Sequence, residues 1–186
     1  MSHRYSHAPR PTSGPISFTL DGRTLTVDSG RKVDIVQLGA VEQVRLTYEP
    51  RGFVQRAYRT KVRMRDGKTF SFSSLTWPSM IQPTNQGPEY GAFARALLHA
   101  IAGANPRARL LAGRPGAIWG ITVALTGASF LGVAFFVWRA LEADAHGAAL
   151  IGALLALVGI WQLEPMVRLN RPRTFTADDP PGDLLP

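Results

Sequence analysis

The chain has 186 residues, a formal net charge of +8 and no cysteine. This length suits one ordinary domain with an appendage and excludes two large soluble domains. The lack of cysteine excludes a disulfide framework, a thiolate zinc site and a cysteine nucleophile, which fits a reducing compartment.

Charge is divided unevenly along the chain. Residues 1–115 carry 17 of the 21 Lys and Arg but only 7 of the 13 Asp and Glu, whereas the remainder carries more acids than bases. A domain this basic predicts an anionic partner, either phospholipid headgroups at a membrane surface or nucleic acid.

The first 15 residues contain three Pro and no periodic apolar pattern. We therefore expect residues 1–15 to be a disordered tail, and nothing in them resembles a secretory signal. His3 and His7 would suit a metal only on an ordered helix, so no metal site is predicted there.

Residues 16–75 alternate apolar and polar side chains between short turns, which is the pattern of antiparallel strands. Two-residue turns at Asp21-Gly22, Ser29-Gly30 and Asp66-Gly67 indicate hairpins. A meander of about six strands is expected, over residues 16–20, 23–28, 31–37, 42–48, 54–65 and 68–74.

A helix is expected after the strands. Gly87-Pro88 offers a start with Pro at the first helical position, and Tyr90, Leu97 and Ile101 belong to its apolar stripe. Gly103 and Pro106 end it. Residues 16–104 are thus expected to form one β domain with a C-terminal helix, and residues 105–115 a basic linker.

Two long uncharged runs follow the linker. Gly116–Trp138 has 23 residues and Gly147–Leu163 has 17, whereas a helix of about 20 apolar residues spans a bilayer. Two buried core helices are the alternative, but they would need too large a core for so small a chain. We predict transmembrane helices over 116–138 and 147–163, joined by the loop 139–146.

The charges around these runs predict their orientation. Three Arg residues precede the first run and three follow the second, whereas the loop has one Arg and two acids. By the positive-inside tendency, the loop faces outward and both termini are cytoplasmic. Residues 164–186 are then a cytoplasmic Pro-rich tail, which is most simply disordered. Trp residues favour membrane interfaces, and three lie near the ends of the runs. These interface anchors are Trp119, Trp138 and Trp161.

Small residues recur at every fourth position in both runs. Such ridges allow close helix packing in lipid, either within the hairpin, which we favour, or between two copies. The predicted helix-packing residues are Gly116, Gly120, Ala124, Ala128 and Gly132 in the first run, and Ala148, Gly152 and Ala156 in the second.

The order of elements resembles that of bacterial pleckstrin-homology-like (PH-like) domains attached to membrane helices. The strand Arg23–Asp28, the segment Ile35–Val44 and the closing helix carry this resemblance, although here the membrane helices follow the domain. The resemblance implies an α+β fold in which an antiparallel split β-barrel is closed by one amphipathic helix. It also implies headgroup or peptide binding at the bacterial inner (cytoplasmic) membrane.

A basic ladder is the most unusual polar feature of the domain. Four cations occupy every second position of one predicted strand and so share one face. They suit phosphate or anionic headgroups, but they would also suit an ordinary solvated face with cross-strand acids. The candidate anion-binding residues are Arg59, Lys61, Arg63 and Arg65, with Arg56 and Lys68 beside them.

The sequence shows no nucleophile with a base, paired carboxylates, metal-ligand cluster or phosphate loop. No enzyme activity, cofactor or metal is therefore expected. Few aromatics interleave with the cations, so nucleic acid is not the expected partner. The predicted function is a membrane-anchored cytoplasmic adaptor that contacts anionic lipid or a protein. Alternatives are an accessory subunit of a larger membrane complex and an enzyme whose site is a polar pocket in the barrel.

Overall fold

The computed structural model describes residues 2–50, 55–79 and 82–186. The chain divides into two compact units, residues 1–113 with 173–186 and residues 114–172. The first is a mixed α+β unit and the second is a helical hairpin, as predicted at this level of detail.

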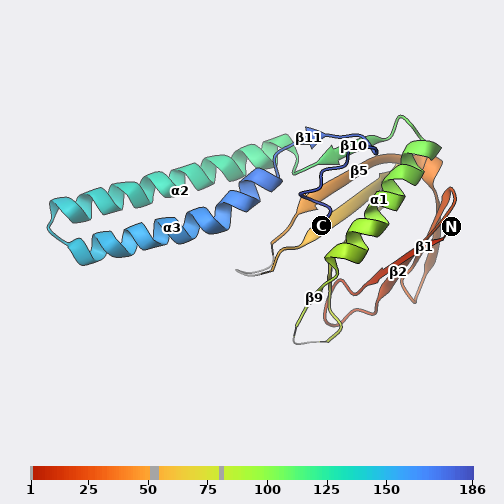
Figure 1. Cartoon of the computed structure of the whole chain (residues 1–186), viewed down its shortest axis with the longest axis horizontal. Helices are drawn as coiled ribbons and strands as arrows, with labels where there is room; N and C mark the ends of the chain where they lie inside the picture. The colour runs from red at the N-terminus through yellow and green to blue at the C-terminus, as the bar shows by residue number, and fades with distance from the viewer. Residues whose placement is uncertain (1, 51–54, 80–81) are drawn as a thin grey trace. The chain divides into compact units, whose positions relative to one another are not determined.

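The first unit contains two main sheets (Figure 1). One is antiparallel, in the order β1-β2-β3-β4, and the other has the order β11-β10-β5-β6-β7, in which β10 runs parallel to β5. The strands of the first sheet are β1 (His3–His7), β2 (Ile16–Asp21), β3 (Thr24–Asp28) and β4 (Val33–Gln37). Those of the second are β5 (Val41–Tyr48), β6 (Tyr58–Met64), β7 (Thr69–Ser73), β10 (Arg109–Ala112) and β11 (Arg173–Thr174).

Shorter elements complete this unit. The 3-10 turn η1 (Leu38–Ala40) joins the sheets, and β8 (Leu75–Thr76) pairs with β9 (Thr84–Asn85). Helix α1 (Gly87–Ala104) follows, with Pro in its first turn as the sequence predicts.

An aromatic core joins α1 to both sheets. Phe93 of α1 lies with its ring centroid 5.2 Å from that of Phe72 on β7 and 5.6 Å from that of Tyr5 on β1. Phe18 and Tyr90 complete the cluster, and Tyr90 also shares a 2.8 Å hydrogen bond with Thr60. The space between α1 and the two sheets is therefore filled by side chains.

Residues 1–15 depart from the predicted disordered tail. His3–His7 pairs along its whole length with Ile16–Leu20 of β2. Tyr5 and His7 point inward and are 4% and 3% exposed. The burial of two rings and a full ladder of backbone hydrogen bonds outweigh the entropy of ordering the segment.

The predictions of a linker over residues 105–115 and a disordered tail over residues 164–186 are also wrong in part. Residues 109–112 form β10 within the second sheet, and residues 173–186 fold back onto the first unit, where Leu184 and Leu185 are fully buried. Arg95 of α1 donates to the carbonyl oxygen of Leu185 at 2.5 Å. The acidic tail thus packs against α1 instead of remaining disordered.

The second unit consists of α2 (Gly116–Glu142) and α3 (His146–Leu169), two antiparallel helices that lie side by side in Figure 1. Both continue past the uncharged runs, so only residues 143–145 connect them. Each is long and apolar enough to cross a membrane, and few of its apolar side chains are buried.

We predict opposite effects for two glycine substitutions in α1. A Cβ at Gly91 would lie 2.2 Å from the carbonyl oxygen of Pro186, whereas a Cβ at Gly103 would meet no atom of the described residues within 4 Å. Gly103→Ala should stabilise the helix by up to about 1 kcal/mol. Gly91→Ala should destabilise the chain by about 1–3 kcal/mol, because residues 184–186 must shift.

The Tm of each full-length variant in detergent measures this difference, and limited proteolysis reports release of residues 175–186. Equal Tm values for the two variants would contradict the described packing of this segment.

Candidate anion-binding face

The alternation predicted for β6 is present. Tyr58, Thr60, Val62 and Met64 are buried, and the cations between them lie on the opposite, solvent-facing side. This division follows from the two-residue period of a strand. The basic ladder therefore belongs to the outer face of the second sheet.

Carboxylates compensate some of the predicted cations. Arg59 pairs with Glu49 at 3.2 Å, and Arg63 pairs with Glu42 at 3.2 Å. Lys68 lies 3.4 Å from Asp66 within the β6–β7 turn. The backbone amide of Lys68 and the Lys68 side chain together lower the pKa of Asp66. These cations are the ordinary solvated pairs of an antiparallel sheet.

The cations at the centre of the face differ from these in their neighbours. Lys61 lies opposite Arg45 of β5 on one side and Ser71 of β7 on the other. Arg45 donates to the carbonyl oxygen of Gly113 at 2.9 Å, and its pKa is lowered by partial burial and then by the charge of Arg109. In the described residues, no carboxylate lies within 4.0 Å of Lys61 or Arg45. We call Arg45, Lys61 and Ser71 the central row.

Hydroxyl groups line the same face. Strand β7 places Thr69 opposite Arg63, Ser71 opposite Lys61 and Ser73 opposite Arg59. A hydroxyl beside a cation gives an anion a neutral donor as well as a charged one. This combination suits the oxygen atoms of a phosphate group.

Two predicted residues, Arg56 and Arg65, flank β6. Arg56 precedes β6 and its carbonyl oxygen accepts from Asn85 at 3.5 Å, while Arg65 follows β6 and its amide donates to the carbonyl oxygen of Ala40 at 3.0 Å. Arg45 and Arg109 were not predicted. The strand of Arg45 could be read from the sequence, but the register that places Arg45 opposite Lys61 could not. Arg109 belongs to β10, which lies within the predicted linker.

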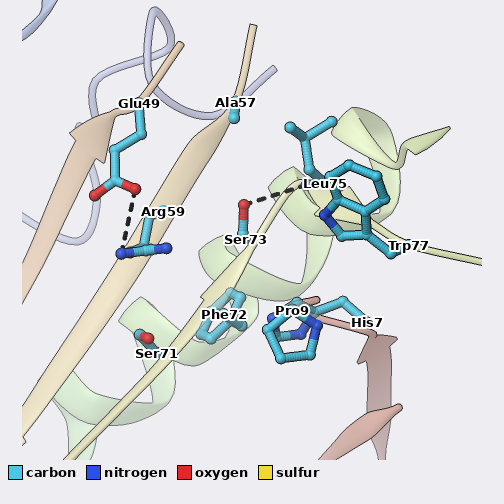
Figure 2. A pocket seen from close by; sticks show the side chains of 10 residues that line it. All are labelled: His7, Pro9, Glu49, Ala57, Arg59, Ser71, Phe72, Ser73, Leu75 and Trp77. Atoms are coloured by element: carbon cyan, nitrogen blue, oxygen red, sulfur yellow. Dashed lines mark hydrogen bonds and ion pairs between the residues drawn. The ribbon is translucent and has the colours of Figure 1, made fainter. Parts of the chain in front are cut away.

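A small polar pocket adjoins this face where β1 approaches β7 (Figure 2). Its volume is about 40 Å³, enough for one or two waters. His7 lines it from β1, and Arg59 and Glu49 line it from the second sheet. The His7 Nδ1 atom is buried and has no hydrogen-bond partner among the described residues. Burial, and then the charge of Arg59, lowers the pKa of His7 to about 4.

In the helical unit, only one of the two predicted small-residue ridges contacts the other helix. A Cβ at Gly152 would lie 2.7 Å from Val137 Cγ2, so the α3 ridge packs against α2. A Cβ at Gly116, Gly120 or Gly132 would meet no described atom within 4 Å. The expected packing of both ridges within the hairpin is therefore wrong for α2, whose remaining ridge residues Ala124 and Ala128 are exposed.

The predicted Trp anchors also differ in their surroundings. Trp138 and Trp161 are 55% and 67% exposed. Trp119 Nε1 donates at 2.9 Å to the carbonyl oxygen of Val167. That oxygen belongs to the last turn of α3, where carbonyls lack intrahelical partners, so Trp119 ties the two helices together.

The depressed pKa of His7 predicts acid sensitivity. The unfolded chain takes up this proton near pH 6.5, but the folded chain takes it up only near pH 4, so stability falls as the pH falls between these values. The full contribution is about 3 kcal/mol. His7→Phe should flatten this part of the pH profile relative to the wild type, as measured by denaturant unfolding. His3→Gln, an exposed change on the same strand, is the control, and an unchanged profile for His7→Phe would contradict the prediction.

No protein-family model matches the chain, and neither a curated protein nor a solved structure is significantly similar to it. The chemistry of the described residues is therefore the basis for a functional proposal.

Proposed function

We propose that the chain is a membrane-anchored binding module whose central row holds the phosphate group of an anionic lipid headgroup. The observation that carries this proposal is that Arg45 and Lys61 lie opposite each other on the outer face of the second sheet, with no carboxylate of the described residues within 4.0 Å of either. Their neighbours Arg59 and Arg63 already have acidic partners. An anion is thus best accommodated at Lys61, with Ser71 as a neutral donor.

The succession of elements supports a PH-like relationship. A four-stranded meander, β1 to β4, precedes a three-stranded one, β5 to β7, and α1 follows. This is the plan that the sequence resemblance implies. The proposed role as an adaptor needs only a rigid sheet that presents its outer face, so no catalytic group is invoked.

Membrane anchoring makes weak contacts sufficient. Only three residues, 113–115, separate β10 from α2, and three more, 170–172, separate α3 from β11. Short connections to a membrane anchor hold a headgroup-binding face at high effective concentration near lipid. Each well-placed cation near an anionic bilayer contributes about 1 kcal/mol.

The pairing of β10 with β11 also supports the proposed topology. Ala112 lies opposite Arg173, so the chain leaves the sheet for α2 and returns from α3 at adjacent positions. If the helices cross a bilayer, the whole first unit lies on one side of it. Basic flanks, including Arg114 and Arg171, favour the cytoplasmic side of a bacterial inner membrane.

A second candidate function is an accessory subunit of a larger membrane complex. The exposed ridge on α2 favours it, because small residues allow close approach of another helix in lipid. A partner that copurifies in fixed ratio with the full chain, and is lost on Gly120→Leu but not on Lys61→Gln, would favour this function.

We predict that Lys61→Gln weakens anionic lipid binding about tenfold, the loss expected for one charge-assisted hydrogen bond. The full chain in detergent is titrated with short-chain phosphatidylglycerol, with phosphatidylcholine as the neutral reference, at low and high salt. Lys68→Gln removes the same charge from a residue already paired with Asp66. The affinity of this variant for phosphatidylglycerol should therefore stay within about twofold of that of the wild type. Equal losses for the two variants would instead indicate nonspecific attraction to a basic domain.

The proposed topology predicts a labelling pattern for single introduced cysteines. Because the chain has no cysteine of its own, only the introduced residue reacts. Ala145→Cys lies between α2 and α3 and should react with a membrane-impermeant maleimide added to intact cells. Lys68→Cys, in the first unit, should react only after the membrane is opened. The reverse pattern would overturn the cytoplasmic placement.

A further inference from the structure

Residues 175–186, which we call the strap, lie along α1 without forming a strand or a helix of their own. Pro186 lies against the start of α1, Leu185 accepts a hydrogen bond farther along it, and the Asp178 carboxylate lies 3.8 Å from a histidine ring nitrogen in its second half. The strap therefore runs antiparallel to the helix. The α1 residues in these contacts are spaced four apart, so they follow one side of the helix. They are Gly87, Gly91, Arg95 and His99.

The start of α1 is shaped to receive the end of the strap. A Cβ at Gly91 would lie 2.2 Å from the carbonyl oxygen of Pro186, and a Cβ at Gly87 would lie 3.3 Å from Pro186 Cγ. The two residues before this proline, Leu184 and Leu185, are fully buried. Two buried leucines and a proline over glycine form a site that recognises a particular short segment, because a larger side chain at Gly91 leaves no room for it.

The rest of the strap is loosely held. Of residues 176–183, only Ala177 is buried, and the Asp178 side chain is 95% exposed. A pocket of about 400 Å³ is lined both by residues 175–178 and by the C-terminal end of α1. Two buried leucines thus offset most of the entropy lost when the whole strap is ordered. A segment held in this way belongs to the least stable parts of a fold and opens most readily.

Charge favours the same contact. The strap contains three Asp and no Lys or Arg, whereas residues 1–115 carry far more bases than acids. Asp183, the residue before the two leucines, forms an ion pair with Arg173 of β11. Arg95 supplies a second basic group beside the leucines, where it donates to the carbonyl oxygen of Leu185. The site is therefore complementary to an acid that is followed by two leucines.

We propose that this side of α1 is a docking site for a segment of a partner protein in which an acid precedes two leucines and a proline. The strap carries that pattern itself and closes the site within the same chain. A partner segment binds when the strap leaves, so the strap is an autoinhibitory contact. This inference depends neither on lipid binding by the central row nor on membrane anchoring.

A synthetic peptide of residues 177–186 serves as the probe for the site. It is labelled with a fluorophore and titrated with the full chain in detergent, and its anisotropy reports binding. In the variant Leu184→Ser with Leu185→Ser, the strap loses both buried anchors, so the site should be open. This open variant should bind the peptide about tenfold more tightly than the wild type, because the wild-type strap occupies most copies of the site.

Two glycine substitutions in the open variant locate the binding surface. Adding Gly91→Ala should weaken peptide binding about fivefold or more, because the new Cβ occupies the place of the proline carbonyl. Gly103→Ala is the matched control, since a Cβ there meets no described atom within 4 Å, and it should leave the affinity unchanged. A peptide with serine in place of both leucines should not bind.

A reversible disulfide tests the closed state. The Cβ positions of residues 87 and 186 lie 3.6 Å apart, within the range of a disulfide, and the chain has no other cysteine. For the chain with Gly87→Cys and Pro186→Cys, we expect the oxidised form to bind the peptide about tenfold more weakly than the reduced form. Equal affinities would show that the strap does not control access to the site.

Three other outcomes would overturn the docking site. A folded open variant that does not bind the peptide would exclude it. Loss of cooperative unfolding in the open variant would show that the strap is part of the core and not a releasable segment. Equal binding of the serine peptide would indicate only nonspecific attraction between an acidic peptide and a basic domain.

Discussion

The antiparallel pairing of β10 with β11 is the constraint on which the rest of the chain depends. These strands are separated by the whole helical hairpin, yet Leu111 lies opposite Thr174 and Ala112 opposite Arg173. The pairing covers the outer edge of β10, which in turn lies beside β5. It also directs the chain back to α1, where Leu184 and Leu185 are buried.

Local signals in the sequence predicted much of the fold. Strands β2 to β7 follow from alternation and from hairpin glycines such as Gly22 and Gly67, whose φ angles of 55° and 84° favour glycine. The missed elements depend on distant contacts. Strand β10 pairs with Val44, which no nearby turn announces, and β1 depends on Tyr5, whose burial requires α1 and β7 to be in place. Sequence periodicity does not contain such contacts.

In the candidate site, too, local signals predicted some features, whereas others depend on distant contacts. The two-residue period placed Arg59, Lys61 and Arg63 on one face, as the structure shows. Whether a cation has a partner depends on the register between strands, which assigns Glu42 to Arg63 and leaves Arg45 beside Lys61. A bulge between Val41 and Gln43 shifts the register where Glu42 lies, and simple counting along β5 does not reveal it. The sequence therefore identified Lys61 but neither Arg45 nor the pairing of each cation with an acid.

The central row also carries an energetic argument. Like charges opposite each other on neighbouring strands destabilise a sheet, and Arg109 adds to the repulsion at Arg45. Carboxylates relieve such repulsion at Arg59 and Arg63. The repulsion between Lys61 and Arg45 is not relieved in this way, so it lowers the stability of the sheet at this position. Proteins tolerate costs of this kind where function requires them. An anion bound there would remove the repulsion, and its binding energy would then add to the stability of the second sheet.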